Sequence, residues 1–114
     1  MKEIILSIFD YHIITMLTRQ DILTFLRDNK EYLQKHFHLT KVGIFGSFAR
    51  EEQKADSDID LLIEMEDETK DIFDLKWELR EFLKKQFNRE VDICGEKYIK
   101  PYAKSYILKD AIYV

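Results

Sequence analysis

Residues 43–64 read GIFGSFAREEQKADSDIDLLIE, and this stretch decides the fold. It joins a Gly-Ser turn at 46–47, which follows an apolar run, to the acidic start of a second apolar run at 58–61. Side chains alternate between the two faces of a strand, so Asp58 and Asp60 are expected on one face and their apolar neighbours on the other. Folding gains nothing from two adjacent carboxylates, whereas a divalent cation between them would be bound by both.

The turn at Gly46 and Ser47 adds a candidate anion site, because a turn that leads into a helix offers backbone N–H groups and a hydroxyl. A phosphate cradle beside two hard-metal ligands indicates chemistry on a nucleoside triphosphate with Mg²⁺. An Asp-x-Asp pattern by itself is as often a solvated strand edge, and Gly-Ser after a strand is a weaker signal still. Their specificity comes from the combination, with Asp58 eleven positions beyond Ser47.

The patterns G-S-x-A-R at 46–50 and S-D-I-D-L-L-I at 57–63 resemble the signature of the nucleotidyltransferase superfamily that includes DNA polymerase β. Within the superfamily, the two patterns are most similar to those of its smallest members, the minimal nucleotidyltransferases (MNT) that act as antitoxins beside HEPN-domain toxins. The resemblance covers about residues 40–114 and implies a fold like the palm of polymerase β.

Enzymes of this superfamily carry a third carboxylate on a strand next to the acidic pair, and Asp92 is the matching residue here. It lies 32 residues beyond Asp60, which leaves room for one helix and its two connections. Glu90 has the same strand parity and is the alternative ligand. An exposed strand charge without a function is the other interpretation of Asp92.

The resemblance also implies roles for these residues. Asp58, Asp60 and Asp92 are expected to be catalytic and to hold two Mg²⁺ ions. Gly46 and Ser47 are expected to hold the β- and γ-phosphates of ATP.

Arg50 has two interpretations: it offsets charge on the phosphates, or it pairs at the surface with Glu51 or Glu52. Residues 46–64 carry six acidic side chains against only Arg50 and Lys54. Such a pocket repels a triphosphate, so we expect nucleotide binding to require the metal.

Composition restricts the class of protein. With 114 residues, 46% of them hydrophobic and 13% aromatic, the chain suits one packed domain. A formal net charge of −4 argues against a basic nucleic-acid-binding surface, so no direct nucleic-acid binding is expected. Cys94 is the only cysteine, which favours a reducing, cytoplasmic location. No apolar run has the length of a membrane span.

The chain is expected to divide into an apolar N-terminal extension at 1–15, of uncertain status, and a nucleotidyltransferase domain at 16–114. Met16 is a candidate alternative start. The apolar and polar patterns predict the following elements: a helix at 18–38 capped by Thr18 and Asp21, strands at 41–45, 58–65 and 90–94, and helices at 48–50, 71–87 and 101–113.

This order predicts an α+β fold, with a small mixed β-sheet whose helices pack on one face and whose other face carries the carboxylates. Phe73 and Trp77 of the 71–87 helix are expected to be packed, and a platform for base stacking is the alternative for Trp77. Tyr102 and Tyr106 share a face of the last helix. Packing against the core or a partner is expected for them, and stacking on a nucleobase is the alternative.

By resemblance, the expected function is transfer of AMP from ATP to a tyrosine of a HEPN ribonuclease toxin, with a hetero-oligomer of the two proteins as the expected assembly. One alternative keeps the chemistry and changes the acceptor to a small molecule such as an aminoglycoside. Another is a non-catalytic antitoxin that acts by binding alone. The tyrosines of the last helix and the apolar N-terminus are the expected contact surfaces for a partner.

Overall fold

The computed structural model describes residues 17–114, so the predicted N-terminal extension lies outside the described part of the chain. Its centre is a four-stranded sheet in the order β3-β2-β1-β4. In chain order the elements are α2 (Arg19–Asp28), α3 (Lys30–Phe37), β1 (Leu39–Phe45), α4 (Gly46–Arg50), β2 (Ile59–Met65), α5 (Ile72–Phe87), β3 (Val91–Gly95), the 3₁₀ turn η1 (Glu96–Tyr98), α6 (Pro101–Lys109) and β4 (Ile112–Tyr113).

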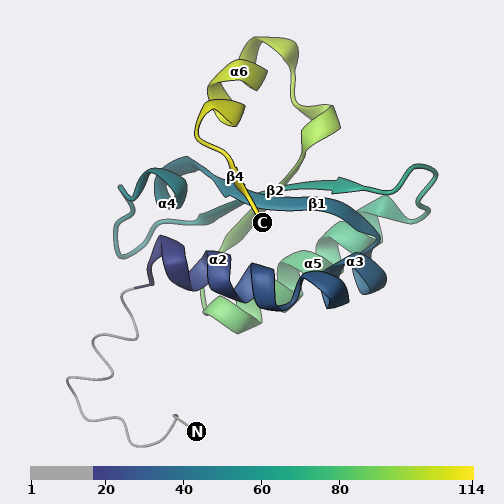
Figure 1. Cartoon of the computed structure of the whole chain (residues 1–114), viewed down its shortest axis with the longest axis horizontal. Helices are drawn as coiled ribbons and strands as arrows, with labels where there is room; N and C mark the ends of the chain where they lie inside the picture. The colour runs from purple at the N-terminus through teal and green to yellow at the C-terminus, as the bar shows by residue number, and fades with distance from the viewer. Residues whose placement is uncertain (1–16) are drawn as a thin grey trace, which may run out of the picture.

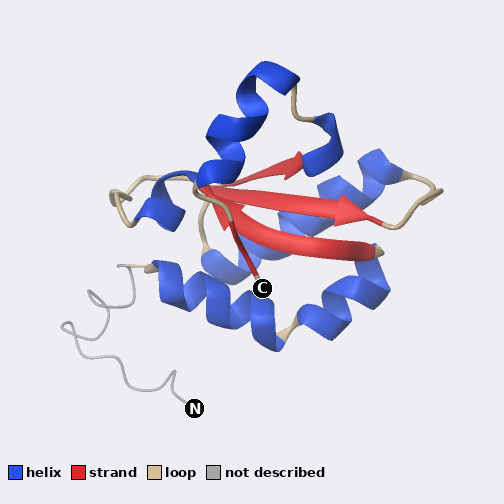
Figure 2. Ribbon diagram, turned by 45° about the horizontal axis from the view of Figure 1, so that its top comes forward, coloured by secondary structure: helices blue, strands red, loops and turns tan. Residues whose placement is uncertain are grey.

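Helices α2, α3 and α5 form one layer beneath the sheet, as Figure 1 shows. The predicted α+β class, with a small mixed sheet and a helical layer on one face, is confirmed. Helix α6 arches over the opposite side of the sheet (Figure 2). It contributes no buried residue, and its apolar residues Ala103, Ile107 and Leu108 are only partly buried. No helix of residues 17–114 is long and apolar enough to cross a membrane.

Strand parity separates a core face from a site face, as the sequence predicts. On β2, Ile59, Leu61 and Ile63 are at most 2% exposed and belong to the hydrophobic core. Asp60 lies between them on the other face and is only half-buried. The acidic residue is therefore held in place by burial of its apolar neighbours on both sides.

The pairing of the strands brings distant acids together. Strands β1 and β2 are antiparallel, and β2 and β3 are parallel, with α5 as the crossover between them. A parallel pair needs such a long connection, which explains the 32-residue spacing of Asp60 and Asp92. In the register of this pair Asp60 lies opposite Asp92.

The helix predicted at 18–38 is divided into two. The predicted cap is present, since the Asp21 backbone N–H donates to Thr18 Oγ1 at 3.1 Å. Asn29 ends α2, however, and its side-chain Nδ2 donates to the Phe25 carbonyl oxygen at 2.8 Å. The backbone of Asn29 leaves the helical range, with φ −109° and ψ 15°, and asparagine is a residue that favours such helix ends over helix interiors.

The helix predicted at 101–113 is also wrong at its end. Helix α6 stops at Lys109, and residues 112–113 form β4, which pairs with β1. Gly43 makes this pairing possible, because a Cβ there would meet the Ile112 carbonyl oxygen and come within 2.9 Å of the Tyr113 ring.

Residues 96–113, from the 3₁₀ turn through α6 to β4, are called the α6 arch below. Tyr113 connects the two ends of this arch. Its hydroxyl donates to Glu96 Oε1 at 2.6 Å, and so joins the segment after α6 to the 3₁₀ turn before it. This hydrogen bond lowers the pKa of Glu96. Burial, followed by the contact with Glu96, raises the pKa of Tyr113.

The expectation that Phe73 and Trp77 are packed is wrong, since they are 88% and 59% exposed. Helix α5 turns Leu79 and Leu83 toward the core. Trp77 lies roughly 200° around the helix from Leu79, on the outer side. A helix of mixed aromatic and charged residues does not reveal from its pattern alone which aromatic faces inward.

We predict that Tyr113→Phe lowers the free energy of unfolding by about 1 kcal/mol near neutral pH, because it removes a hydrogen bond to a carboxylate but keeps the ring. Glu96 has a lowered pKa in the folded protein, so this contribution is present above the ordinary glutamate pKa and is lost as the pH falls through the folded-state value. Urea denaturation at neutral and acidic pH measures the difference.

The matched control is Tyr102→Phe, which removes a hydroxyl that is exposed on the same arch. A Tyr113→Phe variant as stable as wild type at neutral pH would contradict this role of the hydrogen bond.

Candidate active site

A cavity of about 400 Å³ opens on the site face of the sheet, between α4 and the end of α6. This volume lies within the range of about 300–1,000 Å³ that is usual for small-molecule sites. The residues that line it are Phe45, Gly46, Ser47, Arg50, Ser57, Asp58, Asp60, Tyr106, Ile107 and Asp110. The predicted turn and the predicted acidic pair therefore face one shared space.

Gly46 is required here for two reasons. Its φ of +75° lies in the left-handed region, where a side chain is strained. A Cβ at this position would also overlap Asp60 Oδ2. The turn can lie directly against the Asp60 carboxylate only because the residue is glycine.

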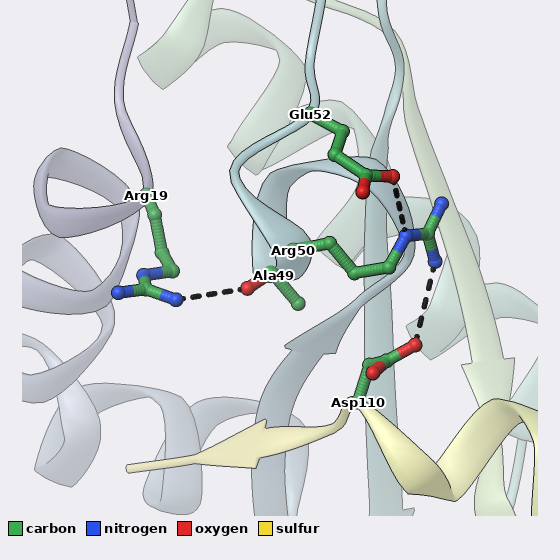
Figure 3. A network of polar contacts seen from close by, with 5 residues as sticks. All are labelled: Arg19, Ala49, Arg50, Glu52 and Asp110. Atoms are coloured by element: carbon green, nitrogen blue, oxygen red, sulfur yellow. Dashed lines mark hydrogen bonds and ion pairs between the residues drawn. The ribbon is translucent and has the colours of Figure 1, made fainter.

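The short helix that follows the turn is firmly attached to the body of the protein. Phe48 and Ala49 are 1% and 4% exposed. Arg19, from α2, donates through Nη1 to the Ala49 carbonyl oxygen at 2.9 Å (Figure 3). This bond satisfies a carbonyl at the end of α4, so the geometry of the Gly46-Ser47 turn is preorganised.

The three predicted acids occupy different environments. Asp60 is half-buried at the floor of the cavity, and Asp58 lies exposed just before β2 at its wall. Asp92 is exposed on β3, opposite Asp60, and is not part of the cavity lining. The sheet thus brings the three acids to one region, with Asp60 between the cavity and Asp92.

The pKa of Asp60 is raised from 3.8 to about 6. Burial is the largest cause, and the charges of Asp92 and Asp58 add to it, while Arg50 opposes them. Asp60 therefore carries its negative charge at a cost, which a bound cation would remove.

Among residues 17–114, no group of three or more His, Cys, Asp or Glu side chains is arranged to hold a metal ion. The donor set of the cavity nevertheless fits Mg²⁺, which is usually bound by one or two carboxylates together with substrate phosphates and water. Asp58 and Asp60 supply two such carboxylates beside the candidate phosphate turn.

Arg50 forms an ion pair with Glu52, which was one of the two interactions predicted for it from the sequence. Its Nε lies 2.9 Å from Glu52 Oε1, and its Nη1 lies 3.5 Å from Asp110 Oδ2 (Figure 3). The guanidinium lines the cavity and joins α4 to the end of α6. Its contact with phosphate stays a prediction.

Glu90, the alternative ligand, is not brought to the cavity. It precedes β3, is exposed, and its Oε1 lies 3.5 Å from Lys84 Nζ. The cavity instead includes residues that sequence analysis did not assign to the site, namely Phe45, Ser57, Ile107 and Asp110. Phe45 and Ser57 carried a signal, since they directly precede the Gly-Ser turn and the acidic pair. The fold of the α6 arch brings in the other two.

Known proteins share the sequence and the fold of this chain. Residues 22–114 match the family model described as a nucleotidyltransferase domain, which falls within the domain predicted at 16–114. Over 100 residues the chain is 34% identical to protein adenylyltransferase MntA of Thermococcus cleftensis. The aligned region covers 87% of this chain and 98% of that protein.

Two solved structures share the fold. One protein, named a "putative minimal nucleotidyltransferase", has a TM-score of 0.68 at 28% identity, over 84% of this chain and 95% of the other. A toxin–antitoxin complex solved with AMP-PNP has a TM-score of 0.60 at 24% identity, over 85% of this chain and 72% of the other. The second likeness concerns the fold alone.

We predict that Asp60→Asn stabilises the metal-free protein at about pH 8, by about 1 kcal/mol once the partial exposure of the carboxylate is allowed for. The folded-state pKa is higher than the ordinary value, so wild type loses stability as the pH rises from about 4 to beyond 6. The variant has no carboxyl to titrate, and its advantage should vanish below about pH 4.

Thermal unfolding in EDTA across this pH range is the measurement, and Asp56→Asn is the control, because it removes an equal charge from the exposed loop before β2. If Asp60→Asn is no more stable than Asp56→Asn at about pH 8, repulsion at Asp60 does not destabilise the fold.

Proposed function

The chain belongs to the nucleotidyltransferase family, and we propose that it transfers AMP from ATP to a tyrosine hydroxyl of a HEPN-type ribonuclease toxin, which it thereby silences. The observation that carries the proposal is the shared cavity, in which Gly46 of the turn lies against Asp60 and Asp58 lines the same space. A phosphate-binding turn and hard-metal ligands in contact are what nucleotidyl transfer requires.

The relatives support this choice of substrate. MntA of Thermococcus cleftensis, whose sequence aligns with most of this chain, is named a protein adenylyltransferase. A structure with the same fold is a toxin–antitoxin complex with a bound ATP analogue. The activity named for MntA favours a protein acceptor over a small molecule such as an aminoglycoside.

In the proposed reaction the Gly46-Ser47 turn binds the β- and γ-phosphates through backbone N–H groups and the serine hydroxyl. Asp58, Asp60 and Asp92 would hold two Mg²⁺ ions, which supply charge neutralisation and alignment of the attacking and leaving oxygens. The tyrosine oxygen forms a bond to the α-phosphorus, and the bond from that phosphorus to pyrophosphate breaks.

Asp92 suits the acceptor side of the reaction. Asp60 separates it from the cavity, and it is exposed on β3, an outer strand of the described sheet. A tyrosine that approaches from β3 would meet Asp92 first, and this carboxylate can take the phenolic proton as the new bond forms. The acceptor oxygen and the leaving pyrophosphate would then lie on different sides of the α-phosphorus.

We predict that the double variant Asp58→Asn, Asp60→Asn folds but no longer transfers AMP to a HEPN-type partner, because both oxygen ligands beside the turn are weakened. Intact-mass spectrometry after incubation with ATP and Mg²⁺ should find wild type adding one or more AMP units to the partner and the double variant adding none. Asp56→Asn, in the neighbouring loop, should behave as wild type.

A double variant that modifies the partner at the wild-type rate would remove these carboxylates from the mechanism. If wild type adds no AMP, yet it and an Asp92→Asn variant still neutralise the toxin, the chain is an antitoxin that acts by binding alone. Labelling of an aminoglycoside in place of the partner would support the small-molecule alternative.

We also predict that ATP binding is at least about tenfold weaker in EDTA than with Mg²⁺, because a cavity lined by Asp58, Asp60 and Asp110 repels a triphosphate. Arg50 offsets little of this charge, since it already contacts Glu52 and Asp110. Titration calorimetry in the two buffers measures the difference. Equal affinities would mean that basic side chains, and no metal, neutralise the phosphates.

A further inference from the structure

We propose that Tyr106 and Ile107, near the end of α6, form the subsite for the nucleobase, with the base stacked on the Tyr106 ring. This inference rests on the proposed function, since it extends the nucleotide site from its phosphates to its base. Neither residue belongs to the phosphate turn or to the acidic set.

The cavity has two chemically different ends. One end carries the Gly46-Ser47 turn and the carboxylates of Asp58 and Asp60. The other is contributed by α6 and its C-terminal cap. It presents the aromatic ring of Tyr106 and the aliphatic side chain of Ile107, together with the Asp110 carboxylate, which is paired with Arg50. A nucleoside triphosphate has the same division, with a charged chain at one end and a flat ring of low polarity at the other.

Core packing does not account for the Tyr106 ring. Helix α6 contributes no buried residue, and Tyr106 is 70% exposed although it lines the cavity. Its aromatic face is therefore available to a ligand. Stacking on an aromatic side chain suits any nucleobase and is worth several-fold to about a hundredfold in affinity per base.

The end of α6 that carries Tyr106 is joined to the helix that carries the Gly46-Ser47 turn. Arg50 follows that turn on α4, and its Nη1 lies 3.5 Å from Asp110 Oδ2, one helical turn beyond Tyr106 (Figure 3). The Tyr113–Glu96 hydrogen bond fastens the base of the same arch. Arg50 is thus a positioning residue for the base subsite, because it ties α6 to α4 across the cavity.

Tyr102 supplies an internal comparison. It lies one turn earlier on the same helix, is 84% exposed, and does not line the cavity. A ring that acted only through helix propensity or through general surface character would have the same effect at either position. A ring that contacts the base acts only from position 106.

Calorimetry of the full chain with Mg²⁺ tests the proposal, using ATP and inorganic triphosphate as two separate ligands. We expect Tyr106→Ala to weaken ATP binding about tenfold and to leave triphosphate binding unchanged, since only ATP carries a base. Tyr106→Phe keeps the ring and should bind ATP as wild type does, and Tyr102→Ala should match wild type for both ligands.

Three results would overturn the base subsite alone: wild-type ATP affinity in Tyr106→Ala, equal loss of both ligands in that variant, or loss of ATP binding in Tyr106→Phe. A wild-type chain that binds ATP no better than triphosphate would do the same, because the base then adds nothing. If wild type binds neither ligand with Mg²⁺ present, both the subsite and the proposed function fail.

Discussion

The charge of Asp60 is the constraint on which the site depends. Burial of Ile59 and Leu61 fixes Asp60 on the opposite face of β2, and the parallel pairing with β3 sets Asp92 beside it. The glycine turn then closes over the same carboxylate. Each of these features helps the fold but crowds a negative charge, and the raised pKa of Asp60 reflects this conflict. Perturbed pKa values are common at functional sites, and here a bound cation would offset the repulsion between the carboxylates.

The rest of the molecule supports that point from two sides. Arg19 and the buried Phe48 attach α4, which begins with the Gly46-Ser47 turn, to the helical layer. On the other side Arg50 and Asp110 join the turn to the α6 arch. The cavity is therefore built between two separately anchored elements, and only the arch is free of the hydrophobic core. The side of the cavity formed by the Gly46-Ser47 turn is therefore expected to be more rigid than the side formed by α6.

Much of the fold could be predicted from the sequence because its strongest signals are local. The Asp-Ile-Asp alternation set the faces of β2, and the interval before Asp92 matched a helical crossover. The errors arose where tertiary contacts decide. Asn29 broke a helix whose apolar stripe continued, and Gly43 admitted β4 through a close approach that spacing does not reveal. Asp110 lines the cavity only because the chain after α6 returns to pair with β1. No local sequence pattern near Asp110 predicts this long-range pairing.

The central claim is that the turn and the acidic pair together bind the triphosphate of a metal–nucleotide complex. A crystal structure of the chain with Mg²⁺ and a non-hydrolysable ATP analogue tests it most directly. We expect Mg²⁺ at about 2.0–2.1 Å from carboxylate oxygens of Asp58 and Asp60, with analogue phosphates on the Gly46-Ser47 turn. An analogue bound elsewhere, or bound in this cavity without a metal–carboxylate contact, would contradict it.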